Sequence, residues 1–131
     1  MSEPITMVAR SLAPSPDSQA EMLQWKRLVS QAVAANQRLE LHYFGGANQI
    51  SAYRLFYMLQ HAKRAGSPHV ALLSDGLFWS DEATDWLAEC GVDEVVLETA
   101  GELPPALATR VAALAGRTDH QPTVILRPRQ G

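Results

Sequence analysis

The sequence LELHYFGGANQISAYRLFYMLQHAKRAGSPHVALLSDG, residues 39–76, decides the expected fold. It begins with a strand pattern at 39–44 that Gly45-Gly46 ends, and it closes with the wholly apolar run 70–73 and a turn at 74–76. Between the two strands, apolar residues recur three and four positions apart, which predicts a helix. A short apolar run is typical of a strand covered on both faces. Strand, helix and strand in this order predict a parallel pair joined by a right-handed crossover.

The same alternation continues on both sides of this stretch. We expect helices at about 17–35, 80–91 and 104–116, strands at 92–97 and 123–126, and a further short strand at 5–8. Alternating elements predict an α/β domain with a small, mainly parallel sheet of four or five strands. A closed (β/α)₈ barrel takes about 250 residues, so this chain is expected to form only part of one. We expect one domain over residues 1–131, with 1–17 and 127–131 flexible.

The spacing of apolar residues also predicts which side chains the helices bury. The candidates are Met22, Trp25, Leu28, Val29, Ala32 and Val33, then Tyr53, Phe56, Tyr57 and Leu59, then Ala83, Trp86 and Leu87, and finally Leu107, Val111 and Leu114. Ser80 is expected to cap the third helix, because a short side-chain oxygen accepts a hydrogen bond from a free backbone N–H. Asn36 is expected to end the first helix, because asparagine tolerates the left-handed conformation.

Charge is distributed unevenly along the chain, whose formal net charge is −3. Nine carboxylates lie between Asp75 and Glu102, and no Lys or Arg occurs between Arg64 and Arg110. Such a region is usually a set of solvated helix faces and loops. The alternative is an acidic surface for a basic partner, and residues 127–129 of another subunit are one candidate. The acidic balance gives no reason to expect binding to nucleic acid.

The composition predicts a cytoplasmic protein that does not enter a membrane. No apolar run approaches the ~20 residues that a membrane span needs. Residues 1–16 lack the basic start and apolar core of a secretory signal. The single cysteine, Cys90, cannot form an internal disulfide, which fits a reducing compartment. We expect Cys90 to be a small buried hydrophobic residue at a helix end.

Three segments resemble the middle of a radical-SAM domain. Residues 41–48, LHYFGGAN, are similar to the family's strand that ends in Gly-Gly-Glu-Pro. Residues 62–76, AKRAGSPHVALLSDG, are similar to its helix ending in Ala-Lys-x-x-Gly and its strand ending in Thr-Asn-Gly. Residues 87–95, LAECGVDEV, follow the common pattern Leu-x-x-x-Gly-Val-Asp-x-Val. Together the segments and the residues between them cover about half of the chain, and their order and spacing carry the resemblance.

The resemblance implies a ligand site at the carboxyl edge of the sheet. In the family, the first segment lies against the amino group of S-adenosylmethionine, and residues after the next strands line the same pocket. Carried over by position, Gly45 and Gly46 are candidates for backbone contact with a ligand, and Ser74 and Asp75 for polar contacts. Ligands of parallel sheets generally bind outside the carboxyl ends of the strands, which supports the same place independently.

The chain departs from the family where the family's chemistry resides. The three-cysteine motif would fall between about residues 9 and 21, and this stretch contains no cysteine. Iron–sulfur clusters are held mainly by thiolates, so we expect no cluster and no reductive cleavage of S-adenosylmethionine. Ala47 stands where the family has a glutamate, and its side chain cannot accept a hydrogen bond.

The histidines show no metal-ligand spacing, and we expect no metal and no cofactor; they are His42, His61, His69 and His120. Our leading hypothesis is a non-catalytic, radical-SAM-like module that binds a partner protein or small ligand at Gly45, Gly46, Ser74 and Asp75. A second is an enzyme with acid–base chemistry at the same edge, using Asp75, Glu98 or His42. A third is a structural subunit, a homodimer or part of a complex, because an incomplete barrel leaves sheet edges unpaired.

Overall fold

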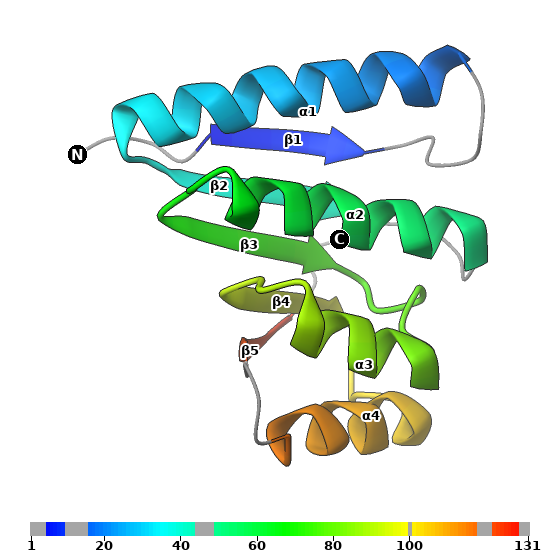
Figure 1. The fold of residues 1–131 in the computed structure, drawn as a ribbon. Helices are drawn as coiled ribbons and strands as arrows, with labels where there is room; N and C mark the ends of the chain where they lie inside the picture. Colours follow the sequence, from blue (N-terminus) through cyan, green and yellow to red (C-terminus); the bar gives the residue numbers. More distant parts are fainter. Residues whose placement is uncertain (1–4, 10–15, 44–48, 100, 118–121, 129–131) are drawn as a thin grey trace.

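Five parallel strands and four helices alternate along the chain in a computed structural model (Figure 1). The structure describes residues 5–9, 16–43, 49–99, 101–117 and 122–128. The elements are β1 (Ile5–Ala9), α1 (Pro16–Ala35), β2 (Arg38–Tyr43), α2 (Gln49–Arg64), β3 (His69–Ser74), α3 (Asp81–Glu89), β4 (Glu94–Thr99), α4 (Pro105–Ala115) and β5 (Thr123–Pro128). The predicted α/β class and parallel sheet are confirmed.

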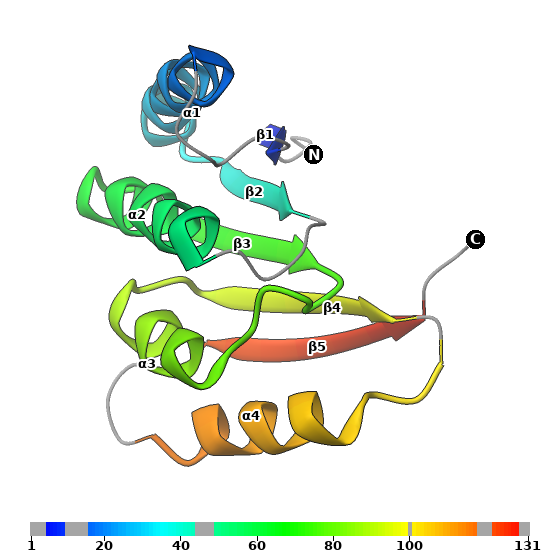
Figure 2. The ribbon, with the colours of Figure 1, turned by 90° about the vertical axis from the view of Figure 1, so that its right-hand side faces the viewer.

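The strands lie in the sheet in the same order as in the sequence, β1-β2-β3-β4-β5. Each is parallel to its neighbour, and right-handed crossovers in this order place successive helices on one side. Figures 1 and 2 show all four helices on one side of a curved sheet. This arrangement is that of a segment of a (β/α) barrel. We call the sheet side opposite the helices the open face.

The strand ends differ from the predicted ones where a side chain replaces a ladder bond. β4 begins at Glu94 rather than residue 92, because the Asp93 carboxylate accepts a hydrogen bond from the Val70 N–H at 2.8 Å. The Lys63 ammonium donates to the same carboxylate oxygen at 2.9 Å. Asp93 therefore joins the start of β3 to the end of α2, and its own N–H donates to the Val70 carbonyl.

The hydrophobic core lies between the sheet and the helices. Side chains pointing from the strands toward the helices, such as Leu41, Leu72 and Leu97, are fully buried. Trp25 on α1 is also fully buried, and its indole Nε1–H donates to the Met58 carbonyl on α2 at 2.8 Å. The core thus holds α1 and α2 together as well as attaching both to the sheet.

Both predicted helix signals are confirmed. Ser80 Oγ accepts a hydrogen bond from the Ala83 N–H at the start of α3. Asn36 adopts a positive φ of 53° directly after α1. Cys90 is buried at the carboxyl end of α3, as expected.

Three of the residues predicted to be buried are exposed, and four, among them Met22, Leu28 and Val111, are half-buried. Val33, Tyr53 and Tyr57 are exposed, and Trp86 is half-buried. On α2 the buried stripe runs through Leu55, Phe56, Met58, Leu59 and Ala62. The tyrosines, four residues apart, therefore share the flank of the helix rather than its inner face. Among the described helices, none is long and apolar enough to cross a membrane.

Candidate functional site

The predicted site at the carboxyl edge lies partly within the described structure. Gly45 and Gly46 are outside the described residues. Ser74 ends β3 and is fully buried, and its Oγ accepts a hydrogen bond from the Gly76 N–H at 3.2 Å. The Asp75 carboxylate accepts one from the Leu77 N–H at 3.0 Å. Both side chains therefore shape the turn that leads toward α3.

The residues of the acid–base hypothesis lie on three different strands or their ends. Asp75 follows β3 at the register position beside Glu98 of β4, since Ser74 pairs with Leu97. The Glu98 carboxylate accepts a hydrogen bond from Arg127 on β5. His42 lies on β2, where its Nε2 is 3.1 Å from the Glu40 carboxylate. Each of Glu98 and His42 is thus already engaged by a neighbour.

A connected group of charged and polar side chains lies on the open face, across β2, β3 and β4. We call Arg38, Glu40, His42, His69 and Glu94 the Arg38 network. The guanidinium Nη2 donates to Glu94 at 2.7 Å, and Nε donates to Glu40 at 2.9 Å. Nη1 lies 3.0 Å from the His69 imidazole. One arginine therefore bridges two carboxylates that come from non-adjacent strands.

A small residue on the middle strand makes this bridge sterically allowed. β2 and β4 are separated by β3, so their backbones are roughly 9.6 Å apart. Ala71 pairs with Glu40 on one side and with Glu94 on the other. The Arg38 side chain must cross β3 at about this level, and a methyl group leaves it room. Ala71 is buried although it faces away from the helices.

The electrostatics of the network favour its charged state. The hydrogen bond from Arg38 lowers the pKa of Glu94, against the smaller opposing effect of burial. Burial is the largest influence on Glu40 and raises its pKa, but hydrogen bonds from His42 and Arg38 together outweigh it and lower the value. The hydrogen bond to Glu94 raises the pKa of Arg38. At neutral pH both carboxylates are therefore ionised and paired.

The sequence contains a signal for this network, although none of the predicted sites included Arg38, Glu40, His69 or Glu94. β2 reads RLELHY, with polar residues at every second position, and its inward residues alternate with partly exposed ones. Such alternation marks the two faces of a strand. The partners His69 and Glu94 open the next two strands, but only the register shows that they meet.

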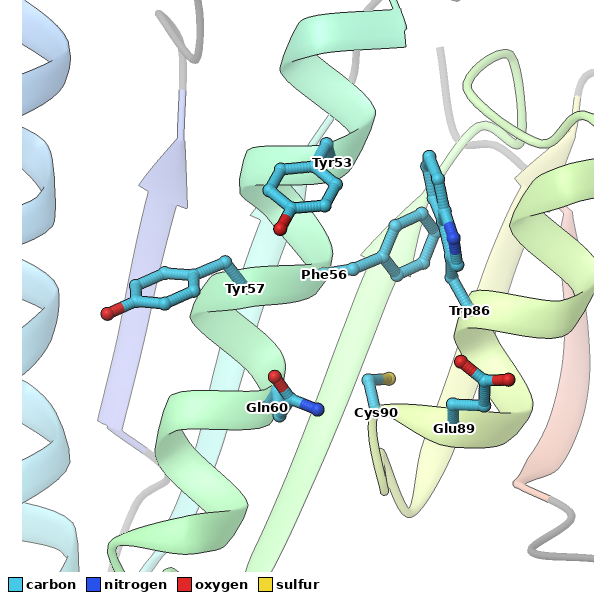
Figure 3. Close-up of a pocket in the computed structure, with 7 residues that line it drawn as sticks. All are labelled: Tyr53, Phe56, Tyr57, Gln60, Trp86, Glu89 and Cys90. Carbon is cyan, nitrogen blue, oxygen red and sulfur yellow. The ribbon is translucent and has the colours of Figure 1, made fainter.

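A second candidate is a groove between α2 and α3, on the helix side of the molecule (Figure 3). Its volume is about 220 Å³. We call it the aromatic groove, and it is lined by Tyr53, Phe56, Tyr57, Gln60, Trp86, Glu89 and Cys90. Burial raises the pKa of the Cys90 thiol to about 11, so the sulfur is protonated at neutral pH. The groove is therefore not the site of a reactive thiolate.

Within the described residues, no group of three or more His, Cys, Asp or Glu side chains is placed to hold a metal ion. In comparisons with known proteins, no family model matches the chain and no curated protein matches it significantly.

Proposed function

We propose that this chain is a non-catalytic, radical-SAM-like module that acts by binding a second protein chain, and that the first such partner is another copy of itself. The observation that carries the proposal is β5. This strand is the last in the sheet and pairs with β4 alone among the described strands. Leu126 faces the helix side and is 57% exposed, whereas Ile125 faces the open side and is 39% exposed. Apolar residues on both faces are typical of an interior strand, not of an edge.

The backbone of β5 has a set of hydrogen-bonding groups that suits pairing with itself. The Thr123 N–H donates to the Asp93 carbonyl, so Thr123 points its backbone groups toward β4. Because these groups alternate along a strand, Val124 and Leu126 point theirs outward. An antiparallel copy centred on Ile125 places Val124 opposite Leu126 of the partner strand. Val124 then exchanges two hydrogen bonds with Leu126 of the copy, and the two-fold axis generates the equivalent second pair, which gives four hydrogen bonds in total.

The two prolines that flank this segment support the same register. Pro122 and Pro128 lie three residues before and after Ile125, so a pair centred there places proline opposite proline at both ends. Neither has an N–H to leave unsatisfied on the outer side. The pairing would therefore end where its donors end.

Charge does not oppose this pairing. Arginine near an edge strand usually discourages association. Here Arg127 forms an ion pair with Glu98 on its own sheet, which balances its charge. In the register centred on Ile125, Arg127 lies opposite Thr123 of the copy, so no two like charges face one another.

The described groups whose pKa values are shifted support a binding role rather than a catalytic one. Both carboxylates of the Arg38 network are held ionised by the arginine between them. The Cys90 thiol is buried and protonated at neutral pH. General acid–base catalysis needs a group whose pKa lies near the working pH, and the groups with shifted values move away from it.

The radical-SAM-like part of the proposal is supported by the arrangement of the sheet. Sequential parallel strands with helices on one side are what the resemblance implies for a partial barrel. The resemblance alone carries the predicted adenosyl-compound site at Gly45, Gly46, Ser74 and Asp75, of which Gly45 and Gly46 lie outside the described residues. A thermal-shift measurement with S-adenosylmethionine tests it: a rise in melting temperature that Gly46→Val abolishes supports the site, and no shift counts against it.

Disulfide trapping tests the self-association directly. In an antiparallel pair, residues opposite one another without hydrogen bonds have Cα atoms about 4.5 Å apart, which a disulfide can bridge. Ile125→Cys should therefore cross-link to a dimer under mild oxidation. Thr123→Cys is the matched control on the same exposed face, and the same register separates its two copies by about 13 Å. The native Cys90 is buried and should not compete.

The oligomeric state of the uncross-linked protein completes the test. By light scattering and sedimentation we expect a dimer that dissociates in Leu126→Lys. Leu77→Lys, at a leucine that is also exposed but lies between β3 and α3, should leave the dimer intact. A monomeric mass at every concentration, or cross-linking that is equal for the two cysteine variants, would refute the β5 interface.

A further inference from the structure

The aromatic groove carries two large aromatic side chains that the fold does not bury. Tyr53 is 65% exposed and Tyr57 is 46% exposed, although both belong to a helix packed on the sheet. Leaving a tyrosine ring in water forgoes the hydrophobic stabilisation of its burial. Aromatic residues gathered on one exposed surface are a frequent mark of a binding site.

The rings form a cluster of edge-to-face contacts, and their outer faces line a slot on the surface. Trp86 makes edge-to-face contacts with Tyr53 at 5.8 Å and with Phe56 at 5.1 Å between ring centroids. Figure 3 shows Tyr53 on α2 and Trp86 on α3, whereas the Tyr57 ring points away from Trp86 toward α1. Each ring face carries partial negative charge from its π electrons, so such a slot attracts cations.

A carboxylate lies at the end of the same slot. Glu89 is on α3, one turn after Trp86, and Figure 3 shows its carboxylate beside the Cys90 sulfur, with the Gln60 amide on the other side. Among the described residues, Glu89 has no ion-pair partner. Two other acids of α3 differ in this respect, since Asp81 pairs with Arg110 and Asp85 with Arg117 on the α4 side.

The opposite flank of the tyrosines has the opposite charge. A hollow of about 300 Å³ between α1 and α2 shares Tyr53 and Tyr57 with the groove and is also lined by Lys26 and Arg54. The two tyrosines therefore form a ridge with cations on one side and Glu89 on the other. A cationic group approaching this ridge is repelled from the α1 side and attracted to the α3 side.

We propose that the aromatic groove receives an arginine side chain from a basic segment of a partner protein. The groove is smaller than the roughly 300–1,000 Å³ of a typical small-molecule pocket, which suits one long side chain rather than a nucleotide. A guanidinium stacks on aromatic faces and pairs with a carboxylate through two N–H groups, and it gives up its hydration more readily than an ammonium does. The surface is on the helix side of the molecule, so the inference is independent of the β5 interface.

Titration with short blocked peptides tests the proposal. The probes are acetyl-Gly-Arg-Gly-amide and the same peptide with citrulline, which has nearly the shape of arginine without its charge. Chemical shifts of the tryptophan indole N–H groups in ¹H–¹⁵N spectra report binding at Trp86. The indoles of Trp25 and Trp79 serve as internal references, because they donate to Met58 and Thr84 inside the protein.

We expect saturable shifts at Trp86 and along residues 53–60 with the arginine peptide, and at least about fivefold weaker binding of the citrulline peptide. Tyr53→Ala and Glu89→Gln should each weaken arginine binding by about fivefold, and both positions are exposed enough to leave the fold intact. Glu102→Gln, an exposed carboxylate before α4, is the charge-matched control and should bind like the unaltered protein.

Three results would overturn the proposal. The first is equal binding of the citrulline peptide, and the second is arginine binding that neither variant weakens. The third is binding of tetramethylammonium as tight as that of the arginine peptide, which would identify the groove as a site for small cations. The β5 interface can fail without affecting any of these measurements, and the reverse is also true.

Discussion

Replacing Arg38 by methionine should destabilise the fold by about 2 kcal/mol at neutral pH. The methionine keeps an apolar stem that can lie over Ala71, so the change removes mainly the guanidinium. Glu94 is then left 15% exposed without its strongest partner. Removing one member of a buried ion pair costs about 3–5 kcal/mol, whereas an exposed pair contributes about 0–1 kcal/mol. Because Arg38 itself is 35% exposed, we place the loss between these limits.

The pH dependence of this loss identifies its cause. The folded-state pKa values of Glu40 and Glu94 lie below the ordinary 4.5, so the network contributes stability above about pH 4.5. That contribution is lost as pH falls through the lowered folded values, when both carboxylates take up protons. The difference between the unaltered protein and Arg38→Met should therefore be largest at pH 7 and shrink toward pH 3.

Urea unfolding followed by circular dichroism at pH 7 and pH 3, at one protein concentration, measures the loss of stability and its pH dependence. A loss of about 2 kcal/mol corresponds to a melting temperature roughly 6–10 °C lower. Asp85→Asn is the control, because it removes a partner that is 65% exposed from the Arg117 pair and should cost less than about 1 kcal/mol. A loss below about 0.5 kcal/mol at pH 7, or the same loss at both pH values, would refute the reasoning.

Three further changes test other parts of the structure. Gly76→Ala should lower the free energy of unfolding in urea by more than about 2 kcal/mol, because φ is +83° and the new Cβ would lie 2.7 Å from a leucine methyl group of α4. Gly66→Ala is the control, because its φ is +101° but no atom lies within 4 Å of the new Cβ, and it should cost about 1 kcal/mol. Equal losses of stability in the two variants would contradict the clash at Gly76. Trp25→Phe removes the indole donor to the Met58 carbonyl and should lower stability by about 1–3 kcal/mol, so a loss under about 0.5 kcal/mol would show that this bond does not hold α1 to α2. Cys90 should react with a disulfide reagent at pH 8 at least about a hundredfold more slowly in the folded protein than in urea, because its pKa is about 11, and similar rates would show that the thiol is accessible.

The main elements of the fold could be predicted because their signals are local. Each of these signals depends on neighbours within a few residues. Examples are the capping Ser80, the left-handed Asn36 and the apolar run of β3. The order of the strands was not among the predictions and comes from the structure, although short right-handed crossovers leave few alternatives for it. The exposure of Tyr53 and Tyr57 could not be predicted, because the spacing that marks a helix does not say where its buried stripe ends.

The sequence by itself determined the alternating elements, the parallel sheet and the uneven charge of this protein, because hydrophobic period and turn chemistry act over short distances. Only the tertiary structure decided which charges meet. Arg38 and Glu94 are separated by 56 residues, and they form a bridge because the register of three strands and the small Ala71 bring them together. Only the tertiary structure could also show the aromatic groove, because its walls come from two helices. The exposure of β5 likewise depends on which strands and helices of the folded chain lie against it.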